Sequence, residues 1–109
     1  MSHNFWHPTL EQCGFILKNQ EVIFIGNLSR NPEVSFEISE EDIEKIGLEN
    51  IECFWHSHPS NNLNLSLDDY AAFLKYPDHK HRIYSQTSFA EYYVRRGFVM
   101  RVENDFTIP

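Results

Sequence analysis

Residues 51–59 read IECFWHSHP, an apolar run that leads directly into two histidines. The run from Ile51 to Trp55 is nearly continuous, which is typical of a short strand buried on both faces of a sheet. Strands of this kind lie inside a sheet rather than at its edge. The sequence therefore predicts a central strand that delivers His56 and His58.

Further strands are predicted on the N-terminal side of this run. Cys13–Leu17 and Val22–Ile25 are short apolar segments rich in branched and aromatic residues, and the polar residues 18–21 join them as in a hairpin. Apolar and polar side chains alternate over residues 34–38, which predicts a third strand with one buried face. The N-terminal half is thus predicted to be mostly sheet.

Two helices are predicted, one before and one after the central strand. Ser39 can cap the first, acidic residues fill its first turn, and Gly47 provides a stop. Ser66 opens the second. Its apolar residues recur at helical spacing, namely Leu67, Tyr70, Ala71 and Leu74. Residues 82–108 are predicted to form two or three strands with a turn at Arg96-Gly97.

The order of these elements predicts an α+β fold, a mixed α/β sandwich with short helices flanking a central mixed sheet. Residues 1–109 are expected to form a single domain, because a chain of this length supports one compact core. The net charge of −7 leaves no large basic surface, so nucleic acid is not an expected partner. No apolar run approaches the ~18 residues that span a bilayer, so no membrane association is expected. Cys13 and Cys53 are expected to be reduced core thiols.

Residues 56–69 predict a metal site. Side chains two positions apart in an extended segment emerge on the same face, so the imidazoles of His56 and His58 can converge on one ion. The ten residues between His58 and Asp69 can form a loop that folds the next helix back over the strand end. Two neutral imidazoles and one carboxylate match a catalytic zinc site whose fourth position holds water. Zn²⁺ is therefore the expected cofactor.

Amide hydrolysis also needs a carboxylate outside the metal shell, which takes a proton from water and returns it to the leaving nitrogen. Glu11 is the candidate, because it immediately precedes the first strand and Gly14 would let neighbouring backbone approach closely. Ser66, one helical turn before Asp69, is the candidate donor to the oxyanion of the tetrahedral intermediate.

Each of these residues also has a purely structural interpretation. Ser66 and Asp69 fit a capping box, in which both side chains satisfy backbone donors. Glu11, taken alone, is a solvated residue before a strand. The second histidine pair, in His79-Lys80-His81, lies in a polar segment without a spaced carboxylate, and it is interpreted as solvated surface. The whole set of residues, rather than any one of them, favours a metal site.

The combination of Glu11-x-Cys13-Gly14, His56-x-His58-Pro59 and Ser66-x-x-Asp69 resembles the JAMM (MPN+, JAB-domain) metallopeptidases. The resemblance implies a JAB/MPN-like, cytidine-deaminase-like fold. It also implies that His56, His58 and Asp69 bind zinc, that Glu11 is the general acid and base, and that Ser66 polarises the scissile carbonyl. Residues 27–32, 36–38 and 41–42 further resemble the JAB domains of phage tail-assembly proteins and related bacterial peptidases.

The expected function is therefore zinc-dependent hydrolysis of a peptide or isopeptide bond in a peptide or protein substrate. The alternative is a non-catalytic JAB module that serves assembly or protein interaction, for instance with phage tail proteins. A zinc deaminase is excluded, because that class uses a Cys-x-x-Cys pair that the sequence lacks. The expected setting is the cytoplasm of a bacterial or phage-infected cell, or the virion.

Overall fold

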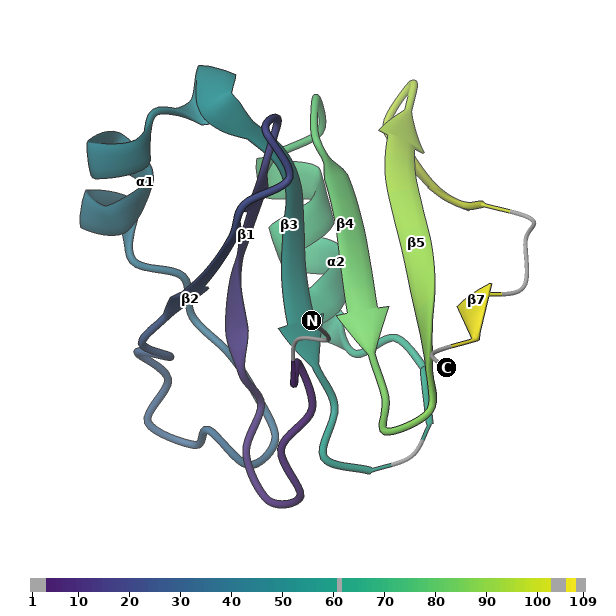
Figure 1. Cartoon of the computed structure of the whole chain (residues 1–109). Helices are drawn as coiled ribbons and strands as arrows, with labels where there is room; N and C mark the ends of the chain where they lie inside the picture. Colours follow the sequence, from purple (N-terminus) through teal and green to yellow (C-terminus); the bar gives the residue numbers. More distant parts are fainter. Residues whose placement is uncertain (1–3, 61, 103–105, 108–109) are drawn as a thin grey trace.

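The computed structural model describes residues 4–60, 62–102 and 106–107 (Figure 1). In chain order the elements are β1 (Cys13–Leu17), β2 (Val22–Ile25), α1 (Glu40–Ile46), the 3₁₀ turn η1 (Leu48–Asn50), β3 (Ile51–Ser57), α2 (Leu67–Lys75), β4 (Lys80–Tyr84), β5 (Ser88–Arg95), β6 (Phe98–Arg101) and β7 (Phe106–Thr107). No helix in this part of the chain is long and apolar enough to cross a membrane.

The described strands form one mixed sheet in the order β2-β1-β3-β4-β5-β6, with β7 also paired to β5. β3 and β4 run parallel, and the other pairs are antiparallel. A parallel pair needs a crossover connection, which contains α2, and this helix lies on one face of the sheet (Figure 1). β3 has a partner on each side, as predicted for the central strand. The predicted α+β class is confirmed.

The hairpin of β1 and β2 forms as predicted, with Gly14 opposite Phe24. Gly14 is crowded from two sides. A Cβ atom at this position would overlap the carbonyl oxygen of Ile23 and lie 2.9 Å from Nε1 of Trp55. The missing side chain thus allows β2 and the indole to approach β1 closely, three residues after Glu11.

The core occupies both faces of the sheet, because neighbouring residues of β3 point to opposite sides. One cluster packs against α1 and contains Phe15, Ile43, Ile51 and Phe54. A second lies on the other face and contains Ile16, Cys53, Trp55 and Tyr84. A third includes Phe73 of α2 with Ile83, Ala90 and Tyr92. Cys13 and Cys53 are buried and free, as expected, and burial raises the pKa of each thiol to about 12.

The third strand predicted over residues 34–38 is wrong, because this segment is a turn followed by a loop. The backbone N–H of Val34 and that of Ser35 donate to the carbonyl of Asn31, which closes a turn. The side chain of Asn27 then acts in place of a partner strand: Oδ1 accepts from the N–H of Glu37, and Nδ2 donates to the carbonyl of Ser35. Side-chain amides that bond backbone in this way compete with sheet formation.

Helix α2 forms where the sequence predicts it, but its apolar row does not face the core. Phe73 and Asp69 are buried, whereas Leu67, Tyr70 and Leu74 are exposed. The interpretation of the second histidine pair as solvated surface is also wrong for His81. β4 begins at Lys80, the residue before His81. His81 is buried, and its Nε2 is hydrogen-bonded to the carbonyl of Tyr76.

Candidate metal centre

Three side chains from two elements meet at the end of β3. His56 is the penultimate residue of the strand, His58 follows it, and Asp69 lies in the first turn of α2. Nε2 of His56 is 2.6 Å from Oδ1 of Asp69, and Nε2 of His58 is 3.3 Å from Oδ2 of the same carboxylate. All three side chains are buried. The structure therefore brings the three predicted ligands together.

Ser66 fixes the position of Asp69. Its Oγ accepts a hydrogen bond from the backbone N–H of Asp69 (3.2 Å), and its own N–H donates to Oδ2 of Asp69 (2.8 Å). These two bonds are a complete capping box, so that interpretation is confirmed. Because Oγ acts here as an acceptor, the hydroxyl hydrogen can still be donated to another group. The cap is compatible with a second role toward a substrate carbonyl.

A loop carbonyl sets the tautomer of His58. Nδ1 of this ring lies 3.2 Å from the carbonyl oxygen of Asn62. A carbonyl only accepts, so Nδ1 carries the hydrogen and the neutral ring has its lone pair on Nε2. Nε2 is the atom that faces Asp69. The contact with Asn62 thus presents the nitrogen that a metal would need.

An aromatic ring holds His56 from the other side. Phe36, in the loop between β2 and α1, stacks on the imidazole with ring centroids 3.9 Å apart and planes inclined by 17°. Burial lowers the pKa of His56 and so favours the neutral ring, which is the form that binds a metal. Phe36 therefore restricts both the orientation and the hydration of this imidazole.

Glu11, two residues before β1, is held through its backbone. Its N–H donates to the carbonyl of Pro32 (2.6 Å), and its carbonyl accepts from Nδ2 of Asn27 (2.9 Å). The next residue, Gln12, is bonded to Ser57 in both directions: its N–H donates to Oγ (3.0 Å), and its carbonyl accepts from the N–H (2.9 Å). These contacts tie the glutamate to the strand that carries the histidines.

The four polar side chains fit a metal ion. One ligand atom from each of Glu11, His56, His58 and Asp69 lies within 4.8 Å of the other three, and all four residues are buried. Among the described residues this is the one cluster of His, Cys, Asp and Glu with such spacing. Imidazole nitrogen and carboxylate oxygen together are donors that suit zinc and related transition metals. The cluster is therefore a candidate metal centre.

The two carboxyl groups of the cluster differ in charge. Burial raises the pKa of Glu11 to about 7, and this effect outweighs the opposing charge of His58. Burial also acts on Asp69, but hydrogen bonds from His56 and His58 outweigh it and hold the pKa of Asp69 well below its usual range. Burial lowers the pKa of His58, but the hydrogen bond to Asp69, the charges of Asp69 and Glu11 and the carbonyl of Asn62 together raise it. The raised pKa favours the doubly protonated ring, in which Nε2 donates to Asp69 and Nδ1 to Asn62. A carboxyl that titrates near neutral pH thus lies beside one that stays ionised.

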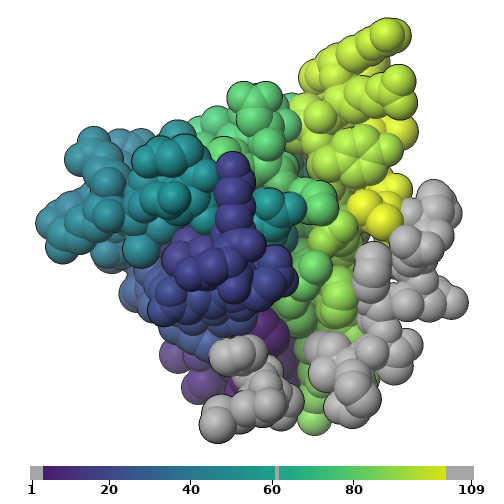
Figure 2. All heavy atoms as spheres, turned by 45° about the horizontal axis from the view of Figure 1, so that its top comes forward, coloured from purple at the N-terminus to yellow at the C-terminus, as the bar shows by residue number. Residues whose placement is uncertain are grey.

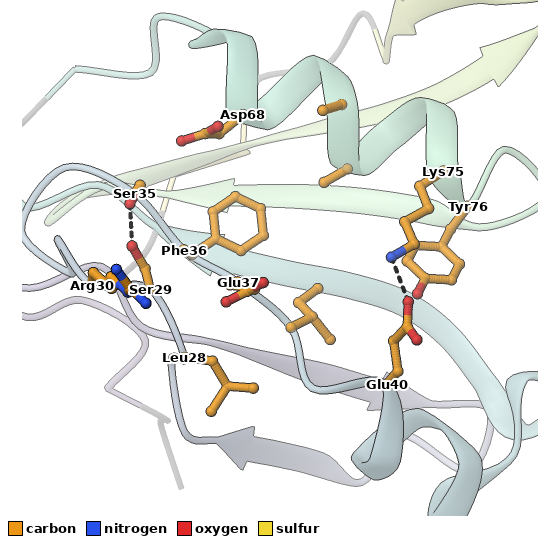
Figure 3. Close-up of a pocket in the computed structure, with 13 residues that line it drawn as sticks. Leu28, Ser29, Arg30, Ser35, Phe36, Glu37, Glu40, Asp68, Lys75 and Tyr76 are labelled. Atoms are coloured by element: carbon orange, nitrogen blue, oxygen red, sulfur yellow. Dashed lines mark hydrogen bonds and ion pairs between the residues drawn. The ribbon is translucent and has the colours of Figure 1, made fainter.

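A groove of about 680 Å³ lies beside this centre, between α2 and a segment made of the loop residues 28–38 and Glu40 at the start of α1. Figure 3 shows Phe36 projecting into the groove, with Asp68 at one end and the ion pair of Lys75 and Glu40 at the other. Because the ring of Phe36 stacks on His56, it is the wall between the groove and the centre. A second hollow of about 350 Å³ is lined by Glu11, Leu10 and Phe24, among others.

Sequence reasoning missed the residues that support the centre. Phe36 belonged to the predicted third strand, and nothing in its spacing connects it with His56. Asn62 acts through its backbone carbonyl, which leaves no signal in residue type. Asn27 was a detectable candidate, since an asparagine after a strand commonly bonds nearby backbone.

No protein family model matches the chain, and no curated protein matches it. Among solved structures, the chain is similar to protein DSY2949 from Desulfitobacterium hafniense, whose structure was determined in solution. The TM-score is 0.63 and the sequence identity is 20%, over 87% of this chain and 77% of that one. At this identity the likeness shows a shared α+β fold, and it carries no statement about function.

Proposed function

We propose that this protein is a zinc-dependent hydrolase of peptide or isopeptide bonds, of the JAMM type that its sequence motifs resemble. The observation that supports the proposal is the buried cluster of Glu11, His56, His58 and Asp69, whose ligand atoms lie within 4.8 Å of one another. A buried group of two imidazoles and two carboxylates is costly unless it is paired or bound to a metal.

In this proposal His56, His58 and Asp69 hold the zinc, and Glu11 stays outside the metal shell. The short contacts of Asp69 with both imidazoles support this division. The pKa of Glu11, raised to about 7 by burial, supports it as well, because a general acid and base works best near the pH of the reaction. Bound zinc would supply Lewis acidity, lowering the pKa of a water to ~7.

Glu11 then takes a proton from the attacking water and delivers it to the leaving nitrogen. Ser66 lies one helical turn before Asp69 and donates its hydroxyl hydrogen to the oxygen of the scissile carbonyl. Asn62 and Phe36 orient the two imidazoles. The groove lined by Phe36 and the hollow lined by Glu11 give parts of an extended peptide or protein room next to residues of the centre or in contact with it.

The resemblance to JAB domains of phage tail-assembly proteins and bacterial peptidases extends the proposal to the setting. It points to a JAB/MPN-like fold, a peptide or protein substrate, phage tail proteins as partners, and a bacterial or phage-infected cytoplasm or the virion. The likeness in fold to DSY2949 is compatible with this proposal, and the proposal does not rest on it.

The test is to strip the protein with a chelator, reload it with zinc and incubate it with extended peptides and isopeptide-linked peptides. We expect about one zinc per chain and cleavage that disappears with the metal. His79→Ala serves as a matched control for His58→Ala, since His79 lies outside the cluster. Zinc binding without cleavage of any substrate would favour the non-catalytic assembly module, and failure to bind zinc would reject both the metal and the enzyme.

A further inference from the structure

Helix α2 turns a row of apolar side chains away from the core. The exposed fractions are 88% for Leu67, 42% for Tyr70 and 49% for Leu74, and Ala71 is exposed between them. These residues recur at the spacing of one helix face. The opposite face of the helix is fully used, because it holds Phe73 in the core and Asp69 at the candidate metal centre.

Opposite charges flank this row at its two ends. Asp68 lies near the start of α2 and Lys75 is its last residue. Both line the groove beside the helix, so both lie on the same side of the apolar row (Figure 3). Lys75 pairs with Glu40 at 2.8 Å, but both side chains are largely exposed and such pairs contribute little. Lys75 can therefore exchange this partner for another carboxylate.

The row and its charges complement a second copy of themselves. We propose that α2 packs antiparallel against α2 of a second copy around a two-fold axis that passes near Tyr70 and Ala71. This two-fold axis reverses the direction of the second helix relative to the first. It leaves the flanks that carry Asp68 and Lys75 on the same side of the helix pair. Asp68 of each copy then meets Lys75 of the other, and the helix dipoles oppose. In a parallel pair, the flanks that carry Asp68 and Lys75 would lie on opposite sides of the two helices. Both contacts between Asp68 and Lys75 would then be lost.

The β5–β6 hairpin offers a matched comparison, because it is exposed and apolar but does not complement itself. Tyr93, Phe98 and Met100 are exposed on it, and their charged neighbours Arg95 and Arg96 have the same sign. Figure 2 shows this hairpin (yellow-green) projecting from the rest of the molecule. Two copies of it would repel, so it is not the expected contact between copies.

The size of the interface limits its strength. A helix of nine residues is about 13 Å long, and four apolar side chains cover much less than the ~800 Å² per partner of a stable complex. The dimer should therefore form reversibly as the concentration rises. The metal ligands face the other way, so dimerisation should not require the metal.

The first test is sedimentation of the full chain from micromolar to millimolar concentration. We expect the mass to rise from 13.0 kDa toward twice that value. Leu74→Glu should hold the chain at the monomer mass across this range, whereas Phe98→Glu on the hairpin should leave the rise unchanged. A monomer at every concentration overturns the proposal, as does a dimer that Phe98→Glu abolishes and Leu74→Glu does not. A mass beyond two chains overturns it as well.

The second test determines the direction of the helices through charge. Asp68→Lys alone and Lys75→Asp alone should each weaken dimerisation, because each places like charges together. The double variant restores opposite charges and should recover most of the wild-type dimer. Equal weakening in the double variant overturns the antiparallel arrangement.

The third test is disulfide trapping under mild oxidation, where buried Cys13 and Cys53 do not interfere. Ala71→Cys lies near the axis and should cross-link to itself. Leu67→Cys should not, but it should cross-link when mixed with Leu74→Cys. Self-linking of Leu67→Cys indicates parallel helices and contradicts the proposal. Circular dichroism spectra of each variant should match the wild-type spectrum, which shows that the variant is folded.

Discussion

Nε2 of His56 lies 2.6 Å from Oδ1 of Asp69, although one side chain comes from β3 and the other from α2. The parallel crossover from β3 to β4 brings these elements together, and the capping box of Ser66 fixes the carboxylate. The imidazole nitrogens that face this carboxylate, Nε2 of His56 and Nε2 of His58, are those that would bind a metal ion. These contacts restrict the orientation of the side chains of His56 and Asp69.

Removing one imidazole should remove the metal. His58→Ala deletes one of three proposed ligands, so zinc content after reloading should fall far below the one equivalent expected for wild type. His79→Ala should keep the full zinc content, because the His79 ring instead contacts the carbonyl of Leu48 and the aromatic ring of Phe54. Metal analysis on both purified variants is the measurement. Zinc retained in His58→Ala and lost in His79→Ala would move the site elsewhere.

The two roles of Ser66 can be separated with a second helix cap. Ser66→Ala and Ser39→Ala each remove a hydroxyl that accepts from a backbone N–H in a first turn. Each should lower the free energy of unfolding by about 1 kcal/mol. Ser66→Ala should in addition slow hydrolysis by ~10²-fold with zinc retained, if its hydroxyl stabilises the oxyanion as we propose. Turnover that is equal in the two variants would leave Ser66 with the capping role alone.

The pKa of Glu11 predicts a pH dependence of stability in chelator-treated protein. Burial raises this pKa from 4.5 to about 7, so between these values the folded protein binds a proton that the unfolded chain has released. The contribution of Glu11 to the free energy of unfolding therefore falls as pH rises from 4.5 to 7. Glu11→Gln lacks this loss. Its stability relative to wild type should rise by about 3 kcal/mol across the window, at about 1.4 kcal/mol for each pKa unit.

Urea unfolding of both proteins at several pH values measures this difference. His58 is present in both proteins, but the Glu11 carboxylate raises the pKa of His58, so the difference reports the titration of the two groups together. A difference that stays constant from pH 4.5 to 7 would show that Glu11 titrates as it does in the unfolded chain.

The fit of β1 between β2 and Trp55 predicts a large effect at one glycine and a small effect at another. Gly14→Ala places a Cβ against the carbonyl of Ile23 and the indole, so the free energy of unfolding should fall by about 1–3 kcal/mol. Gly26→Ala meets nothing within 4 Å and should change stability by less than about 0.5 kcal/mol. Similar thermal midpoints for the two variants would show that β1 and β2 tolerate a wider spacing.

Much of the fold follows from local pattern. The buried run of β3, the β1–β2 hairpin and the capped ends of both helices all have signals within a few residues, and each prediction was confirmed. The structure also brings together the four polar residues that the sequence singled out. The types and spacing of His56, His58 and Asp69 suit one metal ion, whereas Glu11 was expected from its place before the first strand.

The errors arise where tertiary contacts override local pattern. Residues 34–38 alternate as in a strand, but Asn27 bonds their backbone and no strand pairs with them. The apolar row of α2 predicts that this row faces the core, but the opposite face of the helix is buried. Phe73 on that face packs in the core, and Asp69 lies at the centre. His81 looks solvated in sequence, yet β4 carries it under α2 beside Phe73. None of these contacts is visible within one segment.

We propose that Glu11 moves the proton in a zinc-dependent hydrolysis, and Glu11→Gln tests this role most directly. The amide keeps the shape of the side chain and removes the proton acceptor, while His56, His58 and Asp69 remain. Turnover of a cleaved substrate and zinc content should be measured on the same samples, with Glu52→Gln as a control outside the cluster. We predict a loss of at least ~10²-fold in turnover with zinc content near that of wild type. Equal turnover in Glu11→Gln and wild type would contradict the account.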